Sequence, residues 1–332
     1  MKALITGGAG FIGSHLAEAL LKKGHKVNVV DNLSTGRLEN IQHLQDKPDF
    51  SFAEGDILDE PLMESLIAEA DEIYHLAAVV GMRSLMEHGI RAFKTNVNGT
   101  EIVLRLASRD KKKVMIASSS NVYGLWKSDT STKVGAEAFA LAYWDDKNLP
   151  VVIARIFDTC GPRQRFDLSA CDAQAGDLEK QTGDHGMVVP RFVSAALLGK
   201  PLFVYGDGTQ SRCFAYVGDV VKGIIGLMET EEAVGRIFNV GSTHEIQIKD
   251  LARKVIELTG SNSEIKYVPC EEVYEEEKKE LKRSVPEISK INGLIGWQPE
   301  VGLDEMLQKV IAYERARLDN NNESEQIEMS ID

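Results

Sequence analysis

Residues 7–13 read Gly7-Gly8-Ala9-Gly10-Phe11-Ile12-Gly13, and this stretch decides the fold of the amino-terminal half of the chain. It follows directly on an apolar run, Ala3 to Thr6, and is expected to lead into a helix. In a strand–turn–helix unit, Gly7 permits the tight turn, Gly10 lets the backbone approach a pyrophosphate, and Gly13 lets helix and strand pack closely. The first N–H groups of the helix then face the phosphates. The stretch therefore predicts a dinucleotide-binding turn, with an unliganded glycine turn as the structural alternative.

Asp31 ends the second apolar run, residues 27–30. A carboxylate at this place accepts hydrogen bonds from the adenosine ribose hydroxyls and repels a 2′-phosphate. Its structural alternative is an ordinary helix cap. Asp56, which follows the third strand-like run, is placed to meet the adenine. We therefore expect the cofactor to be NAD rather than NADP.

Apolar runs alternate with amphipathic, helix-like stretches through the first half of the chain, which predicts an α/β fold: a doubly wound, parallel Rossmann sheet with crossover helices on both faces. The NAD-binding domain is expected to comprise residues 1–160 and about 214–241. A smaller carboxy-terminal substrate-binding lobe is expected over about 161–213 and 242–318, and the polar residues 319–332 are expected to be a disordered tail.

The composition excludes several classes of protein. The net charge of −13 disfavours nucleic-acid and anionic-membrane binding, so an anionic ligand needs a local arginine cluster. No apolar run approaches the roughly 20 residues of a membrane helix, and no cleavable leader is expected ahead of the first strand. The four cysteines lack the spacing of a zinc site. We therefore expect a cytoplasmic protein without a metal.

Further motifs follow the glycine turn in a fixed order. They are Asp31-Asn32-Leu33-Ser34, Gly55-Asp56-Ile57, His75-Leu76-Ala77-Ala78, Asn96-Val97-Asn98-Gly99-Thr100, Ser118-Ser119-Ser120-Asn121-Val122-Tyr123-Gly124, Gly161-Pro162-Arg163-Gln164 and Val204-Tyr205-Gly206-Asp207-Gly208. Together they resemble the extended short-chain dehydrogenase/reductases, in the NAD-dependent nucleotide-sugar epimerase/dehydratase family that includes UDP-glucose 4-epimerases and UDP-glucuronate decarboxylases. The resemblance covers residues 1 to about 317.

The resemblance implies a reaction: members hold NAD, oxidise a sugar C4 hydroxyl transiently, and then epimerise, dehydrate or decarboxylate the 4-keto sugar. It implies that Ser119 hydrogen-bonds the C4 oxygen and that Lys133 holds the nicotinamide ribose. The implied cofactor contacts are Gly7, Gly10, Phe11, Ile12, Gly13, Asp31, Asn32, Ser34, Asp56, Ile57, Leu76, Ala77, Ala78, Asn96, Ser118 and Lys133. The implied substrate contacts are Asp158, Val189, Arg191, Tyr205, Arg212 and Arg283. Any one of the arginines could instead form a surface salt bridge.

The chain departs from the family pattern where the chemistry takes place. The family's catalytic tyrosine lies four residues before the lysine, and Asp129 stands there in this chain. Tyr123, close to Ser119, is the candidate replacement base, whereas Tyr143 and Tyr274 fit the same Y-x-x-x-K pattern without a link to the site. Asn121 replaces a glutamate that dehydratases and decarboxylases carry.

An extra segment, Arg165 to His185, is longer than its family counterpart. It could rebuild the lid of the sugar pocket and supply an acid or base, or it could be an exposed loop with no chemical role.

These observations favour a UDP-sugar enzyme, and a C4 epimerase in particular. The alternative is a catalytically weakened member that binds NAD and nucleotide sugar as a regulatory or structural subunit. The resemblance also implies a homodimer whose interface is formed by helices near 95–108 and 134–143, with Val103, Leu104, Phe139 and Leu141 on that surface.

Overall fold

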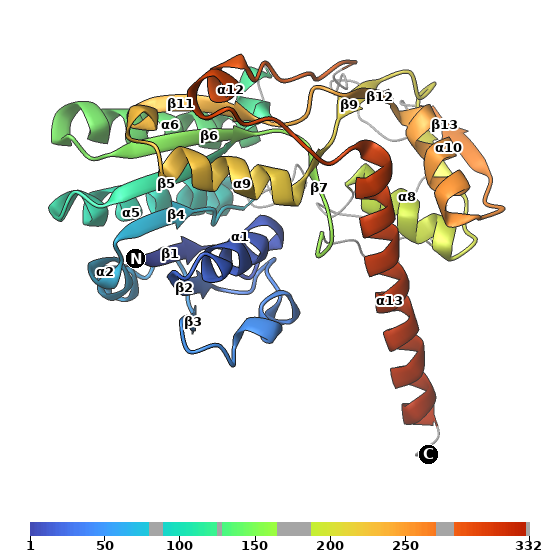
Figure 1. Cartoon of the computed structure of the whole chain (residues 1–332), viewed down its shortest axis with the longest axis horizontal. Coiled ribbons are helices and arrows are strands. Elements are labelled where there is room, and N and C mark those ends of the chain that lie inside the picture. Colours follow the sequence, from blue (N-terminus) through green and yellow to red (C-terminus); the bar gives the residue numbers. More distant parts are fainter. Residues whose placement is uncertain (80–88, 125–127, 165–186, 270–281, 330–332) are drawn as a thin grey trace. The chain divides into compact units, whose positions relative to one another are not determined.

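The computed structural model describes residues 1–79, 89–124, 128–164, 187–269 and 282–329, and within them seven strands form one parallel sheet (Figure 1). In spatial order the strands are β11 (Arg236–Val240), β6 (Val151–Ile156), β5 (Lys113–Ser119), β4 (Glu72–His75), β1 (Lys2–Thr6), β2 (Lys26–Asp31) and β3 (Phe50–Glu54). The chain runs outward from β1 to β3 and then returns to β4 on the other side of β1. The predicted doubly wound parallel sheet is confirmed. The reversal between β1 and β4 is the topological switch point, where sheets of this kind have their ligand-binding crevice at the carboxyl ends of the strands.

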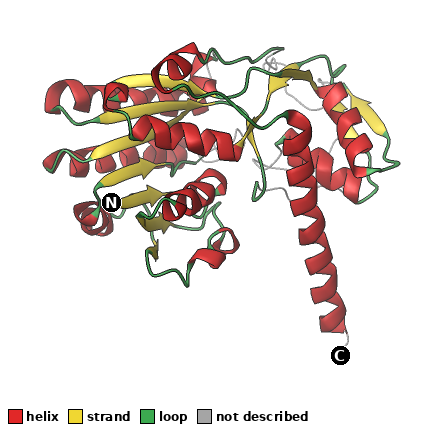
Figure 2. Cartoon of the chain, in the orientation of Figure 1, coloured by secondary structure: helices red, strands yellow, loops and turns green. Residues whose placement is uncertain are grey.

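Helices cover both faces of this sheet (Figure 2). On one face α1 (Phe11–Lys22), α9 (Val217–Met228) and α12 (Ser289–Ile295) form a connected layer. On the other face lie α2 (Glu60–Glu69), α5 (Gly99–Arg109) and α6 (Ser128–Lys147). Shorter helical segments are η1 (Leu38–Asn40), η2 (Gln42–Leu44), α4 (Gly89–Phe93), the π-helix η3 (Lys94–Asn98), η4 (Ser120–Tyr123) and η7 (Glu231–Ala233).

Apolar burial holds α5 to the sheet. Val103 and Leu104, which the sequence places on a dimer surface, are both 0% exposed and belong to the core that α2, α5 and the central strands share. That part of the interface prediction is wrong, because the apolar side chains of α5 are buried in the core of their own chain.

The chain divides into two compact units. Unit 1 comprises Met1–Thr159, Val217–Ser242 and Pro286–Glu300, and unit 2 comprises Cys160–Tyr216, Thr243–Val285 and Val301–Asp332. The sequence places residues 286–300 in the substrate-binding lobe, whereas contacts place them in unit 1. The Trp297 indole N–H donates to the Asp219 carbonyl at 2.9 Å, and Ile291 is fully buried. Such long-range packing leaves no local signal in the sequence.

Among its described residues, unit 2 contains small sheets and three packed helices. Its strands are β8 (Leu202–Tyr205), β9 (Ser211–Cys213), β10 (Ala215–Tyr216), β12 (Glu245–Gln247) and β13 (Ile265–Val268), and β7 (Thr159–Cys160) spans the boundary between the units. Its helices are α8 (Val188–Leu197), α10 (Ile248–Thr259) and α13 (Leu303–Met329). Strand β8 pairs with β13 in parallel, and β9 pairs with β12 in antiparallel orientation.

Helix α13 extends to Met329, whereas the sequence predicts a disordered tail from residue 319. Glutamate, glutamine and arginine are good helix formers, so a polar composition alone does not end a helix that begins on a buried apolar face. In the part of the chain that the structure describes, we find no helix of the length and hydropathy needed to cross a membrane.

Candidate functional site

The turn after β1 has the geometry that its glycines predict. Gly7 has a φ of 71°, in the left-handed region, and a Cβ built there would lie 2.8 Å from the Ala77 backbone nitrogen. A Cβ on Gly10 would lie 3.1 Å from the Gly7 carbonyl oxygen, and one on Gly13 would overlap the same atom. A side chain at Gly7 or Gly13 would therefore push the turn apart, and one at Gly10 would press against the Gly7 carbonyl.

Helix α1 begins in this turn and presents its amino terminus to the crevice. Gly10 is the N-cap residue, in extended conformation, and gives no side-chain hydrogen bond. The first N–H groups of a helix have no partner within the helix. A phosphate at the turn would satisfy them, and the helix dipole favours its negative charge.

Asp31 lies at the carboxyl end of β2, beside the turn. Its carboxylate accepts hydrogen bonds from the Ala9 N–H at 3.1 Å and the Leu33 N–H at 2.9 Å, which ties the turn to the segment after β2. Burial raises the pKa of Asp31, and these two hydrogen bonds oppose the rise. Beside it, the Asn32 amide donates to the Asp56 carboxylate at 2.9 Å. The predicted ribose and adenine contacts are thus brought together.

A buried histidine that sequence reasoning missed joins β1 and β4 at the crevice. The His75 ring nitrogens lie 2.8 Å from Thr6 Oγ1 and 3.0 Å from Thr100 Oγ1. Burial lowers the pKa of His75 to about 3, so the ring is neutral at physiological pH. Thr6 Oγ1 also accepts the Ala77 N–H at 3.2 Å, which fixes the backbone that passes beside Gly7.

Asn96 is engaged by the protein itself. Its side-chain amide accepts from the Val79 N–H at 2.7 Å and donates to the Val79 carbonyl at 2.8 Å. It also donates to Thr132 Oγ1 at 3.1 Å. We interpret Asn96, expected as a cofactor contact, as the residue that holds the segment after β4 beside α6.

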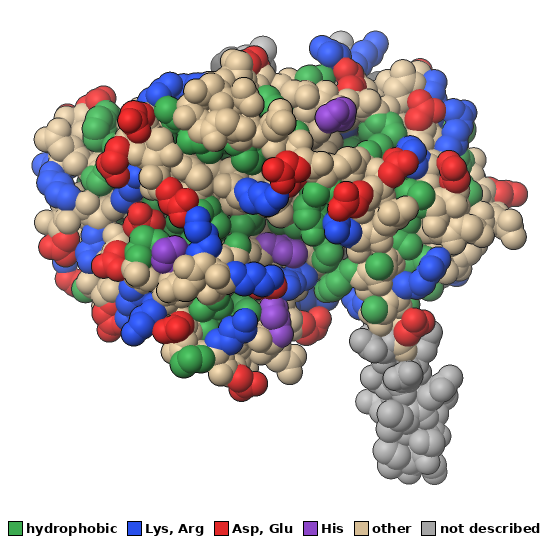
Figure 3. All heavy atoms as spheres, in the orientation of Figure 1, with side chains coloured by type: hydrophobic (Ala, Val, Ile, Leu, Met, Phe, Trp, Pro, Cys, Tyr) green, Lys and Arg blue, Asp and Glu red, His purple; other side chains and the backbone are tan. Residues whose placement is uncertain are grey.

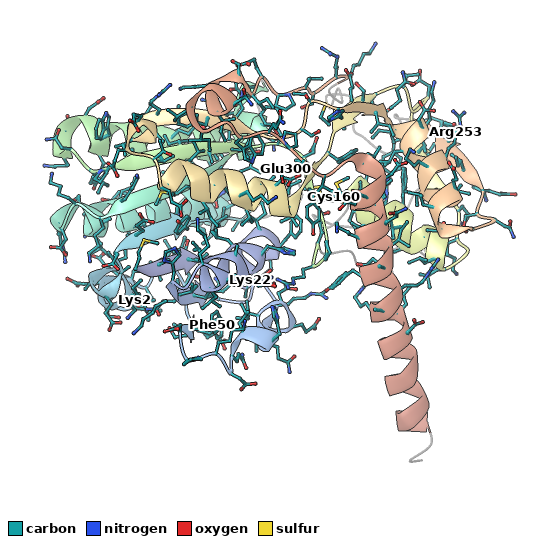
Figure 4. The ribbon with its side chains drawn as sticks, in the orientation of Figure 1. Lys2, Lys22, Phe50, Cys160, Arg253 and Glu300 are labelled. Atoms are coloured by element: carbon teal, nitrogen blue, oxygen red, sulfur yellow. The ribbon has the colours of Figure 1, made fainter. Side chains whose placement is uncertain are left out.

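The end of β5 brings Ser119 and Lys133 to the same edge of the sheet. Lys133 is 8% exposed, and its ammonium donates to the Ala117 carbonyl at 2.8 Å. The Ser119 hydroxyl accepts the Asn121 N–H at 3.2 Å and caps η4. The opposite, amino-terminal edge of the sheet is marked by Lys2 in Figure 4.

A buried ion pair, absent from the sequence analysis, supports this edge. Arg155 on β6 donates to both carboxylate oxygens of Glu137 on α6, at 2.9 and 2.7 Å, and Glu137 also accepts from the Ser118 hydroxyl. Ser118, expected to contact the cofactor, therefore faces Glu137. The pair lies one turn of α6 beyond Lys133 and locks the helix to the strand ends.

Tyr123 points to a different partner. Its hydroxyl donates to Asn239 Oδ1 on β11 at 2.7 Å, and the Arg155 guanidinium lies 4.7 Å from the ring centroid. Strand β6 separates β11 from β5, so Asn239 lies about two strand spacings, on the order of 10 Å, from the Ser119 strand. In this arrangement the structure does not bring the Tyr123 hydroxyl to Ser119.

Five of the six predicted substrate contacts belong to unit 2; Asp158 belongs to unit 1, between β6 and β7. Arg191 on α8 donates to the Tyr205 hydroxyl at 2.6 Å and lies 4.5 Å from that ring's centroid. Val189 is buried on the same helix. Arg212 lies on β9, next to Ser211, and Arg283 pairs with Ser211 through a parallel β-bridge.

Comparison with known families identifies the chain. A family model described as GDP-mannose 4,6 dehydratase matches residues 4–310. The chain belongs to this family. It is a family of NAD-dependent nucleotide-sugar epimerases and dehydratases within the extended short-chain dehydrogenase/reductases, so the predicted membership is confirmed.

Two relatives in this dehydratase family are decarboxylases by name. A UDP-N-acetyl-alpha-D-glucosaminuronate decarboxylase of Bacillus cytotoxicus is 37% identical, over 95% of this chain and 98% of the relative. A UDP-glucuronic acid decarboxylase 1 of Xenopus tropicalis is 35% identical, over 98% of this chain and 75% of the relative. Both names describe enzymes, which does not favour a non-catalytic subunit.

Similar solved structures are epimerases by name. The Bacillus cereus UDP-glucuronic acid 4-epimerase, in complex with UDP-glucuronic acid and NAD, has a TM-score of 0.83 and 29% identity over 95% of this chain and 99% of that chain. The Thermotoga maritima UDP-glucose 4-epimerase, with UDP-glucose, has a TM-score of 0.83 and 28% identity over 96% and 100%.

The position of the family tyrosine, occupied here by Asp129, lies in α6. Asp129 and Lys133 are four residues apart in the same helix, α6. Tyr143 donates to Glu101 at 3.0 Å, away from Lys133. Tyr274 and the Arg165 to His185 segment lie outside the described residues.

Among the residues that are described, no group of histidine, cysteine, aspartate and glutamate could hold a metal ion.

Proposed function

We propose that this chain binds NAD in the crevice between the ends of β1 and β4. The glycine turn has no room for side chains, the α1 amino terminus has no side-chain cap, and Asp31 stands at the ribose position. These are the features that a pyrophosphate and an adenosine ribose require. When bound, NAD supplies the acceptor and later the donor of a hydride at the sugar C4.

We further propose that the reaction is decarboxylation of a UDP-linked uronic acid. The observation that carries this proposal is the identity of 37% and 35%, over nearly the whole chain, to two decarboxylases of such sugars. It replaces C4 epimerisation, which the sequence favours, as the first candidate.

The chemistry of a uronic acid explains how decarboxylation can proceed with Ser119 and Lys133 but without the family tyrosine and glutamate. Oxidation at C4 makes the sugar a β-keto acid, because the C6 carboxylate is attached to C5. The C5–C6 bond then breaks, CO₂ leaves, and the electron pair moves onto the C4 oxygen. C5 takes up a proton, and the hydride returns to C4. We propose that the Ser119 hydroxyl stabilises the charge on the C4 oxygen, and that Lys133 holds the nicotinamide ribose.

Asn121 is compatible with this step. Dehydration requires a base that removes the C5 proton, and an amide cannot serve as that base. Loss of CO₂ removes no C5 proton. Replacement of the glutamate by Asn121 therefore argues against dehydration more strongly than against decarboxylation. From the sequence, Asn121 is unfavourable for both reactions. They differ in the bond that breaks at C5, which is C–H in dehydration and C–C in decarboxylation.

C4 epimerisation is the second candidate. The solved structures similar to this chain include a 4-epimerase that acts on UDP-glucuronic acid, and epimerisation shares the first oxidation with decarboxylation. The two reactions differ in whether the carboxylate leaves before the hydride returns.

The test uses the full chain with NAD and four sugars: UDP-glucuronate and UDP-N-acetylglucosaminuronate, each labelled with ¹³C at C6, and UDP-glucose and UDP-N-acetylglucosamine. We expect labelled CO₂ and a UDP-pentose from one uronate, and no product from the neutral sugars. A product that keeps the label and is inverted at C4 would establish the epimerase instead. Ser119→Ala is the control that should slow product formation about 100-fold while NAD still binds.

We also propose that the chain forms a homodimer through α4 and α6. Phe93, Val134 and Phe139 are 48%, 46% and 37% exposed, so α4 and α6 present apolar surface that a second copy of the chain could cover. Light scattering should give a dimer mass at micromolar concentration, and Phe139→Glu should shift the mass toward the monomer. A monomeric unmodified chain would refute the proposal.

A further inference from the structure

Glu245 and Arg283 form a side-on ion pair in unit 2. The Arg283 Nε–H lies 3.0 and 3.1 Å from the two Glu245 carboxylate oxygens, and Nη2 donates to Oε2 at 3.0 Å. One edge of the planar guanidinium is therefore filled by a single carboxylate.

The carboxylate is itself fixed by a neighbouring strand. Glu245 lies on β12, and the Ser211 hydroxyl on β9 donates to its Oε1. Ser211 also pairs with Arg283 through a parallel bridge, and its N–H donates to the Lys282 carbonyl at 2.9 Å. Three backbone segments thus hold the three side chains together. Hydrogen bonds from Arg283 and Ser211 hold the pKa of Glu245 below its ordinary value, so it is ionised at neutral pH.

Stability does not account for this arrangement. The side chain of Arg283 is 68% exposed and that of Glu245 is 32% exposed. Exposed ion pairs contribute little to folding, because water screens the charges and ordering a long side chain costs entropy. The same ordering does matter for a ligand, since an arginine that is already fixed loses less entropy when it binds.

Glu245 leaves the other edge of the guanidinium to a ligand. The pair uses Nε–H and one Nη2–H, and the fork formed by Nη1 and the second Nη2–H matches two phosphate oxygens. A carboxylate that competed with the ligand would have to cover this fork. In a chain of net charge −13, a fixed arginine fork is the kind of local feature that an anionic ligand needs.

We propose that Glu245 is a positioning residue that orients Arg283 to bind the diphosphate of the nucleotide sugar. The inference rests on the proposed function, which supplies the diphosphate. It adds a role for Glu245, a residue that contacts no substrate atom. Ser211 completes the support by holding the carboxylate.

The experiment measures binding of UDP and of uridine to the full chain by calorimetry. In Glu245→Gln we expect the Kd for UDP to rise about 3- to 10-fold, the range for losing one pre-ordered side chain. Uridine, which lacks phosphate, should bind unchanged. The matched control is Glu305→Gln, which removes a more exposed glutamate from its pair with Lys309 in the same unit and should change neither Kd.

A double-mutant cycle tests whether the effect passes through Arg283. In an Arg283→Ala background, Glu245→Gln should have no further effect on UDP binding. Unchanged or tighter UDP binding in Glu245→Gln would overturn the inference, and tighter binding would make Glu245 a competitor of the diphosphate. Equal losses for UDP and uridine would also overturn it, as a structural effect. Failure of the unmodified chain to bind UDP at millimolar concentration would instead refute the proposed function, and the inference with it.

Discussion

The two ends of the crevice in unit 1 are built in different ways. At the β1 turn the ligand-facing groups are backbone atoms, and what the sequence must supply is the absence of side chains at Gly7, Gly10 and Gly13. At the end of β5 the chemistry that we propose depends on single side chains, and Asp129 stands in place of one of them, the family tyrosine. A site made of backbone is complete once the fold forms, whereas a site made of side chains can lose one group while the fold survives. The predictions below test this difference.

The largest effect is expected from Gly13→Ala. The added methyl group would overlap the Gly7 carbonyl, and backbone on both sides prevents the turn from moving away. We expect NAD binding to fall at least about 100-fold and unfolding to be destabilised by about 1–3 kcal/mol. Calorimetry with NAD and thermal unfolding measure both.

The matched control is Gly293→Ala on α12, where a Cβ meets nothing within 4 Å. It should bind NAD normally and be stabilised slightly. Equal NAD affinity in Gly13→Ala and the unmodified chain would mean that the turn is not the pyrophosphate site.

A smaller effect is expected at the reacting end. Ser119→Ala should slow C4 oxidation about 100-fold, as loss of one hydrogen-bond donor to a developing oxyanion does. Tyr123→Phe should keep the rate within about two-fold, because the Tyr123 hydroxyl donates to Asn239 on β11 and so is not the general base at Ser119. Single-turnover absorbance of reduced NAD reports both rates. A loss in Tyr123→Phe as large as that in Ser119→Ala would make Tyr123 the replacement base.

The smallest effect concerns cofactor choice. Asp31→Ala should shift the ratio of NADP to NAD affinity about 10-fold toward NADP, because the charge that repels a 2′-phosphate is removed. Equal affinities for the two cofactors in the unmodified chain would contradict this account.

A pH series sharpens the same prediction. Burial raises the pKa of Asp31, so the carboxylate that we propose accepts the ribose hydroxyls is lost as the pH falls, beginning at a higher pH than for an ordinary aspartate. NAD affinity should therefore decrease on acidification in the unmodified chain, and Asp31→Asn should lack this component.

The sequence allowed prediction of the features that are local. The glycine turn, the doubly wound parallel sheet and the position of Asp31 at the end of the second strand follow from local patterns, and the structure has them as expected. The Glu137–Arg155 pair and the His75 contacts could not be predicted, because they join segments far apart in the chain whose residue types carry no pairing signal. Val103 and Leu104 show the converse error: an apolar stripe indicates burial, but not whether the chain itself or a partner covers it.

The most direct test of the proposed site is the rate at which the unmodified chain oxidises a UDP-uronate at C4. The cofactor end is complete, but Asp129 beside Lys133 would favour an ion pair, and such a carboxylate is a poor base. A positioned base contributes about 10² to 10⁴-fold, and ordinary enzymes turn over at about 10 s⁻¹, so we predict about 10⁻³ to 10⁻¹ s⁻¹ for the single-turnover reduction of NAD. A rate near 10 s⁻¹ would contradict the account, because it would mean that a fully competent base remains at the end of β5. No reduction at all with any UDP-uronate, despite bound NAD and nucleotide, would refute the proposed reaction.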